Sequence, residues 1–169
     1  MKVQILSMLI FLCGHFTQSY GQVEKYKALF IYKFVQGMEW PVSKVSDSYK
    51  ITVLGDDAVF NQLKTMIKGR FVNGKEIEVS KYKPGTPLEN YVILFLGHSK
   101  RSLFENLQKE AVSSSTVLIT ETPGFAQKGS FINFNVESSK LKFELNKSSF
   151  NTSSVKVSGT LESLATIVN

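Results

Sequence analysis

The sequence predicts an α/β fold: a single three-layer domain with a mainly parallel sheet flanked by helices and a C-terminal β-hairpin. Apolar, strand-like runs alternate with segments of helical periodicity, a pattern typical of right-handed βαβ crossovers in a sheet covered on both faces. Near the C terminus, two segments alternate apolar with polar residues across a short polar turn, which indicates a hairpin with one exposed face. The 169 residues, 43% of them hydrophobic, suffice for one such core and exclude a disordered or collagen-like chain.

The N-terminal 21 residues have the pattern of a secretory signal peptide. After Met1 and Lys2, an apolar run over 3–13 is too short to span a bilayer but has the length of a signal-peptide core. Ser19 and Gly21 are small residues at the −3 and −1 positions of a cleavage before Gln22. We therefore expect a signal peptide over 1–21 and an α/β domain over 22–169, with an uncleaved N-terminal anchor as the alternative.

The cysteine content and the net charge limit the functions that the mature chain can have. Cys13 is the only cysteine, so after cleavage neither disulfides nor thiolate nucleophiles nor cysteine-based metal sites are expected. The whole chain carries 20 Lys and Arg against 14 Asp and Glu, a net charge of +6, which bears on solubility rather than on fold. No later apolar run is long enough to span a bilayer, so we expect an exported soluble protein, periplasmic in a Gram-negative cell.

The first half of the mature chain predicts a helix, a strand and a second helix. The first helix ends at Gly37, and its apolar stripe is formed by Tyr26, Leu29, Phe30 and Phe34, widened by Ile31 and Val35. A β-branched, apolar strand is expected over 49–54. Asp56 and Asp57 stand at the N-cap of a helix with apolar positions at Val59, Phe60, Leu63, Met66 and Ile67.

The second half of the chain continues the alternation of strands and helices and then ends in a hairpin and a short helix. The expected elements are strands over 75–80, 91–96 and 116–120, a helix over 103–111, a hairpin of 131–136 and 140–145, and a short apolar helix over Leu161–Val168. A helix as short as the last one must dock on the domain to be stable.

The loops after three predicted strands are the places where a ligand would bind, because the crevice of a parallel sheet forms at the carboxyl ends of its strands. The aspartates in these loops are also expected as helix caps, and His98 as an exposed loop residue. Phe125 is either a core side chain or a ring presented to a ligand. The candidates after Leu54, Leu96 and Thr120 are Asp56, Asp57, His98, Glu121, Pro123, Gly124 and Phe125.

Motifs of common enzyme classes are absent from the sequence. It has no Gly-x-Ser-x-Gly, Gly-x-Gly-x-x-Gly or Gly-x-x-x-x-Gly-Lys-Ser/Thr motif, so no nucleophile elbow and no nucleotide site is predicted. We expect no catalytic residue, metal or cofactor; the enzymatic alternative is a hydrolase that uses His98 with Asp56 or Glu121. The basic residues over 64–83 lack interleaved aromatic residues, so nucleic acid is not an expected partner.

Several short segments, taken in order, carry a resemblance to a known family. They are 27–34, Glu39-Trp40-Pro41, 51–57, Gly69-Arg70, Gly74-Lys75, 120–126, Gly129, 132–134, 143–146 and 161–165. Together they resemble the YfiR family of small exported regulatory proteins over nearly all of residues 24–168. The resemblance implies a periplasmic α/β domain that acts by binding and not by turnover. It also implies a partner, the extracytoplasmic domain of an inner-membrane diguanylate cyclase or sensor histidine kinase, and so control of cyclic-di-GMP output in the first case.

The chain departs from the redox-responsive members because its mature part has no cysteine, so a disulfide switch is not implied. Ser130 stands where a second glycine often follows Gly129. A homodimer is compatible with the resemblance. The alternative function is a periplasmic small-ligand-binding protein, in which Trp40, Arg70 and Phe125 line a pocket and Arg70 binds an anionic group.

Overall fold

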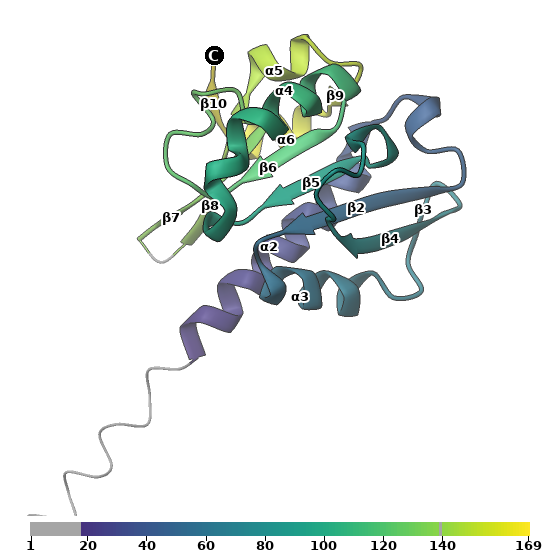
Figure 1. Cartoon of the computed structure of the whole chain (residues 1–169). Helices are drawn as coiled ribbons and strands as arrows, with labels where there is room; N and C mark the ends of the chain where they lie inside the picture. Colours follow the sequence, from purple (N-terminus) through teal and green to yellow (C-terminus); the bar gives the residue numbers. More distant parts are fainter. Residues whose placement is uncertain (1–17, 139) are drawn as a thin grey trace, which may run out of the picture.

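The computed structural model describes residues 18–138 and 140–169. The predicted signal peptide falls mostly on residues 1–17, which lie outside the described residues, and it stays a prediction. The first described helix, α2, runs over Gln18–Gly37 (Figure 1), so it begins before Gln22, the expected first residue of the mature chain. Within the described residues, no helix combines the length and the apolar character needed to cross a membrane.

A mostly parallel sheet forms the centre of the domain, as predicted. Among the described residues its strand order is β10-β8-β7-β6-β5-β2-β4-β3. Neighbouring strands pair in parallel except β3 with β4 and β7 with β8, the predicted C-terminal hairpin. The strands are β2 (Ser48–Leu54), β3 (Phe71–Val72), β4 (Lys75–Lys81), β5 (Ile93–Leu96), β6 (Val117–Thr120), β7 (Ile132–Glu137), β8 (Lys140–Asn146) and β10 (Thr166–Val168).

Helices cover both faces of this sheet, which gives the three predicted layers. α2 and α3 (Asp57–Ile67) lie side by side on one face, and α4 (Phe104–Ser114) lies on the other (Figure 1). Every residue of the central strands β5 and β6 is buried, because strands with helices on both faces have no solvated side. These strands are therefore continuously apolar except for Thr120, whose hydroxyl donates to Asn133 Oδ1 at 2.7 Å.

A cluster of phenylalanine rings joins α2 to the hairpin of β7 and β8. Phe34 is fully buried, and its ring lies 5.1 Å from the ring of Phe143 on β8 at an angle of 70°. Phe30 lies 5.4 Å from Phe143 and 6.2 Å from Phe134 on β7. Tilted and edge-on pairs at these distances add to the stabilisation that burial provides. The first helix and the last hairpin thus share one core.

The buried face of α2 differs from the predicted apolar stripe. Tyr26 and Leu29 were expected in the core, but they are 44% and 38% exposed. The helix packs against α3 on one side and approaches β8 on the other, so its buried arc is centred near Ile31 rather than near Phe30. The buried residues of α2 are Lys27, Ala28, Ile31, Tyr32, Phe34 and Val35.

The expected C-terminal helix over 161–168 is wrong in its second half. The helix, α6, covers Gly159–Leu164 and starts after Ser158, whose side chain caps it by accepting the Leu161 N–H. Ala165 is extended, and Thr166–Val168 form β10, which pairs in parallel with β8. Three consecutive β-branched residues next to an open strand edge favour this strand over a further helical turn.

Some short elements were not predicted from the sequence. β1 (Met38–Glu39) pairs with β9 (Lys156–Val157) in a separate two-stranded sheet directly after α2. α5 (Lys147–Asn151) follows β8 and packs Phe150 edge-on against Phe131. Short 3₁₀ helices occupy Val42–Lys44, Leu88–Asn90 and His98–Leu103.

Candidate functional site

The strand order reverses at the carboxyl ends of β2 and β5, which is where the sequence predicts a binding crevice. From β2 the chain runs through α3 to β4 on one side, and β5 then pairs with β2 on the other side. In α/β sheets such a reversal opens a crevice between the two following loops. Here those loops begin at Gly55 and Gly97.

The two glycines bring these loops into direct contact. A Cβ atom on Gly97 would lie 2.6 Å from the Gly55 carbonyl oxygen, so only glycine allows this approach. The Gly97 N–H donates to the Leu54 carbonyl at 2.8 Å, and the Ser99 hydroxyl donates to the Gly55 carbonyl at 2.6 Å. The backbone of one loop therefore fills the space that a phosphate or cofactor would need at this point.

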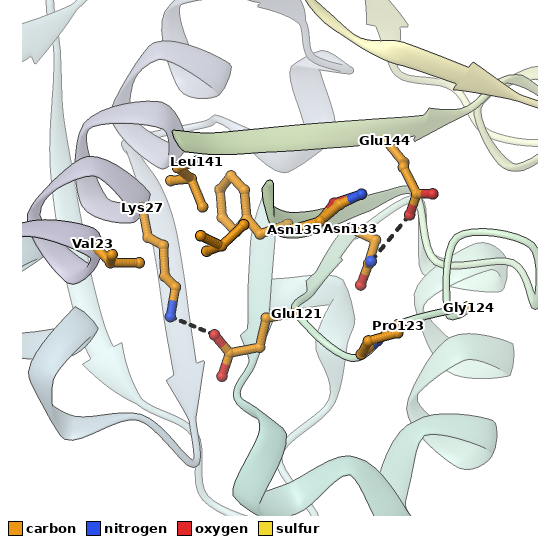
Figure 2. Close-up of a pocket in the computed structure, with 11 residues that line it drawn as sticks. Val23, Lys27, Glu121, Pro123, Gly124, Asn133, Asn135, Leu141 and Glu144 are labelled. Atoms are coloured by element: carbon orange, nitrogen blue, oxygen red, sulfur yellow. Dashed lines mark hydrogen bonds and ion pairs between the residues drawn. The ribbon is translucent and has the colours of Figure 1, made fainter. Parts of the chain in front are cut away.

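The ammonium group of Lys27, on α2, closes the crevice on the side of that helix. This α2 side chain is buried, and its Nζ lies 2.5 Å from Glu121 Oε2, the ion pair drawn in Figure 2. Carboxylate oxygens of Glu24 and Asp56 lie 3.7 and 3.9 Å from the same Nζ. All four side chains are at least five-sixths buried. A buried charge must be paired in this way, because water no longer solvates it.

Three of the predicted candidates gather at this ion-pair network. Asp56 is the N-cap of α3, as expected, and its Oδ1 accepts the Val59 N–H at 2.9 Å. Glu121 Oε1 accepts the backbone N–H of His98 at 2.8 Å. The His98 ring is exposed and lies 3.2 Å from the Thr122 hydroxyl. Asp56, His98 and Glu121 thus meet in space, but each carboxylate already holds a structural partner.

Lys27 and Glu24 are the residues of this network that sequence reasoning missed, and Lys27 is its centre. The sequence contained a signal, since Lys27 lies between Val23 and Ile31, at helical spacing on the face that faces the core. A lysine on an otherwise apolar face needs a buried carboxylate partner. The partner itself, Glu121, is far away in the sequence and becomes visible only when β6 is placed beneath α2.

The remaining loop candidates have separate surroundings. Asp57 is exposed at the first turn of α3 and forms a surface ion pair with Lys81 at 2.7 Å. Phe125 stacks on Phe104 of α4 at 4.1 Å between ring centroids and packs against the core. Pro123 and Gly124 line the cavity described below.

Trp40 and Arg70 lie away from these loops. The Trp40 indole N–H donates to the Val35 carbonyl at 3.0 Å, and its ring packs against the core next to β1. The Arg70 guanidinium lies 5.0 Å above the ring of Tyr32. Neither residue, nor Phe125, lines either of the two cavities described below. The structure therefore does not bring Trp40, Arg70 and Phe125 together as the hypothesis of an anion pocket requires.

A cavity of about 280 Å³ opens beside the Lys27–Glu121 pair, between α2, the loop after β6 and the hairpin (Figure 2). We call it the β7 notch. Glu144 faces it and accepts hydrogen bonds from the side chains of Asn133 and Gln127 at 3.1 and 3.3 Å. The notch is lined by Val23, Lys27, Glu121, Pro123, Gly124, Asn133, Phe134, Asn135, Val136, Leu141 and Glu144. A second cavity of about 370 Å³ lies between β8, α5, β9 and α6 and contains none of the predicted candidates.

The acidic side chains of the notch and of the crevice are arranged around the Lys27 ammonium. Within the described residues, no group of three or more His, Cys, Asp or Glu side chains could hold a metal ion. The carboxylates that approach one another are bridged by the Lys27 ammonium. His98 contacts a hydroxyl and no carboxylate through its ring, so the arrangement of a general base with an orienting acid is not formed.

The domain is a small α/β domain whose sheet crevice is filled by its own side chains and backbone. The chain belongs to the YfiR/HmsC-like family, which it matches over residues 24–166. The sequence-based resemblance is thereby confirmed. This family is regulatory, and membership places the chain among periplasmic regulators of signalling.

Comparison with solved structures supports the fold. The domain is similar to a conserved domain protein from Vibrio cholerae O1 biovar El Tor, with a TM-score of 0.57 and 9% sequence identity. The similarity covers 86% of this chain and 60% of that one. At this identity the likeness concerns the arrangement of helices and strands. No curated protein matches the sequence.

Proposed function

We propose that this chain is a periplasmic binding protein that controls a membrane-bound signalling protein, a diguanylate cyclase or a sensor histidine kinase, by contact with its extracytoplasmic domain. The general class, regulation of signalling, follows from the family. The partner class follows from the resemblance described above and is the part that requires a test. The chain acts by binding to its partner and not by converting a substrate.

The filled crevice carries this proposal. At the point where α/β enzymes bind substrate, Lys27 is bonded to Glu121, and the backbone of Gly97 touches that of Gly55. Opening this place to a substrate would break a buried ion pair, which costs several kcal/mol. The chemistry-bearing loops therefore serve stability, and the surfaces left for function are outside the crevice.

Exposed apolar side chains beside the crevice supply such a surface. Val136 at the end of β7 is 53% exposed, and Tyr26 on α2 is 44% exposed. Val136 lines the β7 notch, and Tyr26 follows the lining residue Val23 by one helical turn. Apolar residues around a concave site are typical of protein-binding surfaces.

In-cell cross-linking of the tagged protein in the envelope, followed by mass spectrometry, tests the proposal directly. We expect recovery of an inner-membrane cyclase or sensor kinase, and a change in the output of that protein when the gene is deleted. Unaltered output of every membrane cyclase and kinase in the deletion strain would contradict the proposal.

The β7 notch also keeps the small-ligand alternative open. Its buried Asn135 Oδ1 has no hydrogen-bond partner among the described residues, and Glu144 forms no ion pair there. These acceptors suit a ligand with amine or amide donors rather than the anion expected with Arg70. A thermal-shift panel of small amines and anionic metabolites tests this function, because a ligand of the native state raises the melting temperature. No shift with any compound counts against it.

A further inference from the structure

The two edges of β7 are covered to different extents. β8 pairs with β7 along its whole length, from Ile132 to Glu137. β6 pairs with β7 only at Ile132 and Asn133, because β6 ends at Thr120. The chain then turns away through Pro123 and Gly124, where Gly124 adopts a φ of 81°. The outer half of β7 consequently has a strand on one side and the β7 notch on the other.

The register shows which backbone groups of β7 face the notch. The Phe131 carbonyl accepts the Asn146 N–H, and in an antiparallel pair alternate residues direct their backbone groups to the same neighbour. Asn133 and Asn135 therefore bond with β8, and Phe134 and Val136 direct theirs to the side of β6. Past the end of β6, the Phe134 C=O and both backbone groups of Val136 have no hydrogen-bond partner among the described residues.

The side chains around these free groups fit an added strand. Val136 and Leu141 form an apolar cross-strand pair at the mouth of the notch, and Val23 faces them from α2. An exposed strand edge with apolar neighbours pairs readily with an extended segment, whose backbone supplies hydrogen bonds and whose alternate side chains fill pockets. Such a segment would continue along the line that β6 leaves after Thr120.

The charges of the notch identify the occupant as a partner with a basic residue. Glu144 is held by the side-chain amides of Asn133 and Gln127, and within the described residues it forms no ion pair at 4 Å or less. The buried Asn135 Oδ1 adds an unpartnered acceptor. A Lys or Arg of an added segment would pair with Glu144.

We propose that the β7 notch binds an extended segment of the partner protein by strand addition to the free edge of β7, with a Lys or Arg of that segment bound to Glu144. This inference rests on the proposed function for the identity of the partner as a signalling protein. It adds the contact surface and the chemistry of the contact.

The test uses the full chain in cells, with a photo-cross-linking amino acid in place of Val136. The matched control carries the photo-cross-linking amino acid in place of Phe71. Phe71 is also an apolar strand residue and is 60% exposed, but it lies on β3 at the opposite end of the sheet. We expect the position of Val136 to cross-link to one extracytoplasmic segment that contains a Lys or Arg, and the position of Phe71 not to do so. Equal capture from both positions, no capture from Val136, or capture of a second copy of the chain overturns the proposal.

A backbone variant tests the pairing itself, with the photo-probe placed at Tyr26. Val136→Pro removes an N–H that has no partner within the chain, whereas Val136→Thr keeps it and retains the β-branched shape. We expect the proline variant to lower capture about tenfold and the threonine variant less than about twofold. Equal capture by wild type and Val136→Pro contradicts strand addition.

Melting temperatures of both variants establish that they fold. If Val136→Pro lowers the melting temperature, Val136→Lys serves instead, because a lysine at a strand edge opposes pairing and repels a basic segment.

The two proposals fail in different ways. Capture of a protein without a signalling domain from Val136 supports strand addition and contradicts the proposed function. Capture of a cyclase or kinase only from Phe71 supports the proposed function and contradicts strand addition.

Discussion

The ammonium of Lys27 lies 2.5 Å from a carboxylate oxygen of Glu121, which joins the first helix of the domain to the loop after β6. Both side chains are largely buried, and two further carboxylates stand within 4 Å of the same nitrogen. This pair separates the filled crevice from the β7 notch. It therefore closes the crevice in which α/β enzymes bind their substrates. It also forms one wall of the proposed contact surface.

Replacement of Lys27 by Met should strongly destabilise the protein. The substitution leaves Glu121, Asp56 and Glu24 without their shared cation in a buried place, and we expect a loss of about 3–5 kcal/mol in the free energy of unfolding. Urea unfolding of the purified protein measures it. The matched control is Lys81→Met, because Lys81 and Asp57 form a similarly short but exposed pair at 2.7 Å, which should cost less than about 1 kcal/mol. Similar losses for the two variants would show that burial does not matter here.

A second lysine, Lys44, is held by backbone groups. Its Nζ donates to the carbonyl oxygens of Leu88, Glu89 and Tyr91 at 3.3, 2.9 and 3.0 Å and to Thr116 Oγ1 at 2.9 Å. Desolvation by burial lowers the pKa of Lys44 from 10.5 to about 8, and the charge of Glu89 opposes this effect. The lysine fastens the 3₁₀ helix before β2 to the segment that leads into β5.

The lowered pKa of Lys44 predicts that stability rises as the pH increases from about 8 towards 10.5. Over this range the unfolded chain keeps the lysine proton while the folded protein releases it, so deprotonation favours the folded state. Thermal unfolding between about pH 7 and 9.5 measures the effect, below the range where Tyr82, whose pKa is raised chiefly by burial, contributes with the opposite sign. Lys44→Met should flatten the profile; an unchanged slope in this variant would assign the effect to other groups.

Phe125→Ala should affect stability before it affects any partner contact. Its ring stacks on Phe104 and packs against the core, so we expect a loss of about 2 kcal/mol, somewhat less than for a fully buried ring. The measurement is the free energy of unfolding together with partner capture by the folded variant. Loss of capture at unchanged stability would instead show that the ring contacts a ligand or partner.

Gly97→Ala should destabilise the crevice loops. Its Cβ would lie 2.6 Å from the Gly55 carbonyl oxygen, a backbone atom that cannot move aside without shifting β2. We expect a cost of about 1–3 kcal/mol, as for other overpacked sites. Gly159→Ala is the control, because a Cβ there has no neighbour within 4 Å, and it should change stability by less than about 0.5 kcal/mol. A neutral Gly97→Ala would mean that the loops have room for a ligand after all.

The centre of the sheet could be predicted from the sequence because its strands are buried on both faces and therefore strongly apolar. β5 and β6 illustrate this, since each is a continuous apolar run bounded by turn residues. The end of the chain could not be predicted in the same way. Residues 166–168 alone allow a helix or a strand, and the choice is made by the open edge of β8, to which β10 pairs.

The sequence predicts which loops lie together but not which side chains lie between them. The loops after β2, β5 and β6 do meet, and Asp56 and Glu121 lie in them as expected. What fills the place is Lys27, whose helix comes from outside the alternating units and whose docking depends on long-range packing against Phe143 and α3. The free edge of β7 was invisible in the sequence because it results from the unequal lengths of β6 and β7, and strand ends are set by tertiary pairing.

The packing of Phe34 on Phe143 has a consequence for how the chain folds. α2 packs mainly on α3, but its phenylalanine side chains are covered only when the hairpin of β7 and β8 is present, so a chain that lacks β8 leaves this part of its core open. Contacts of such high sequence separation slow the approach to the native state. For a regulator that works on the far side of a membrane, completion of the core therefore requires that nearly the whole chain has been delivered.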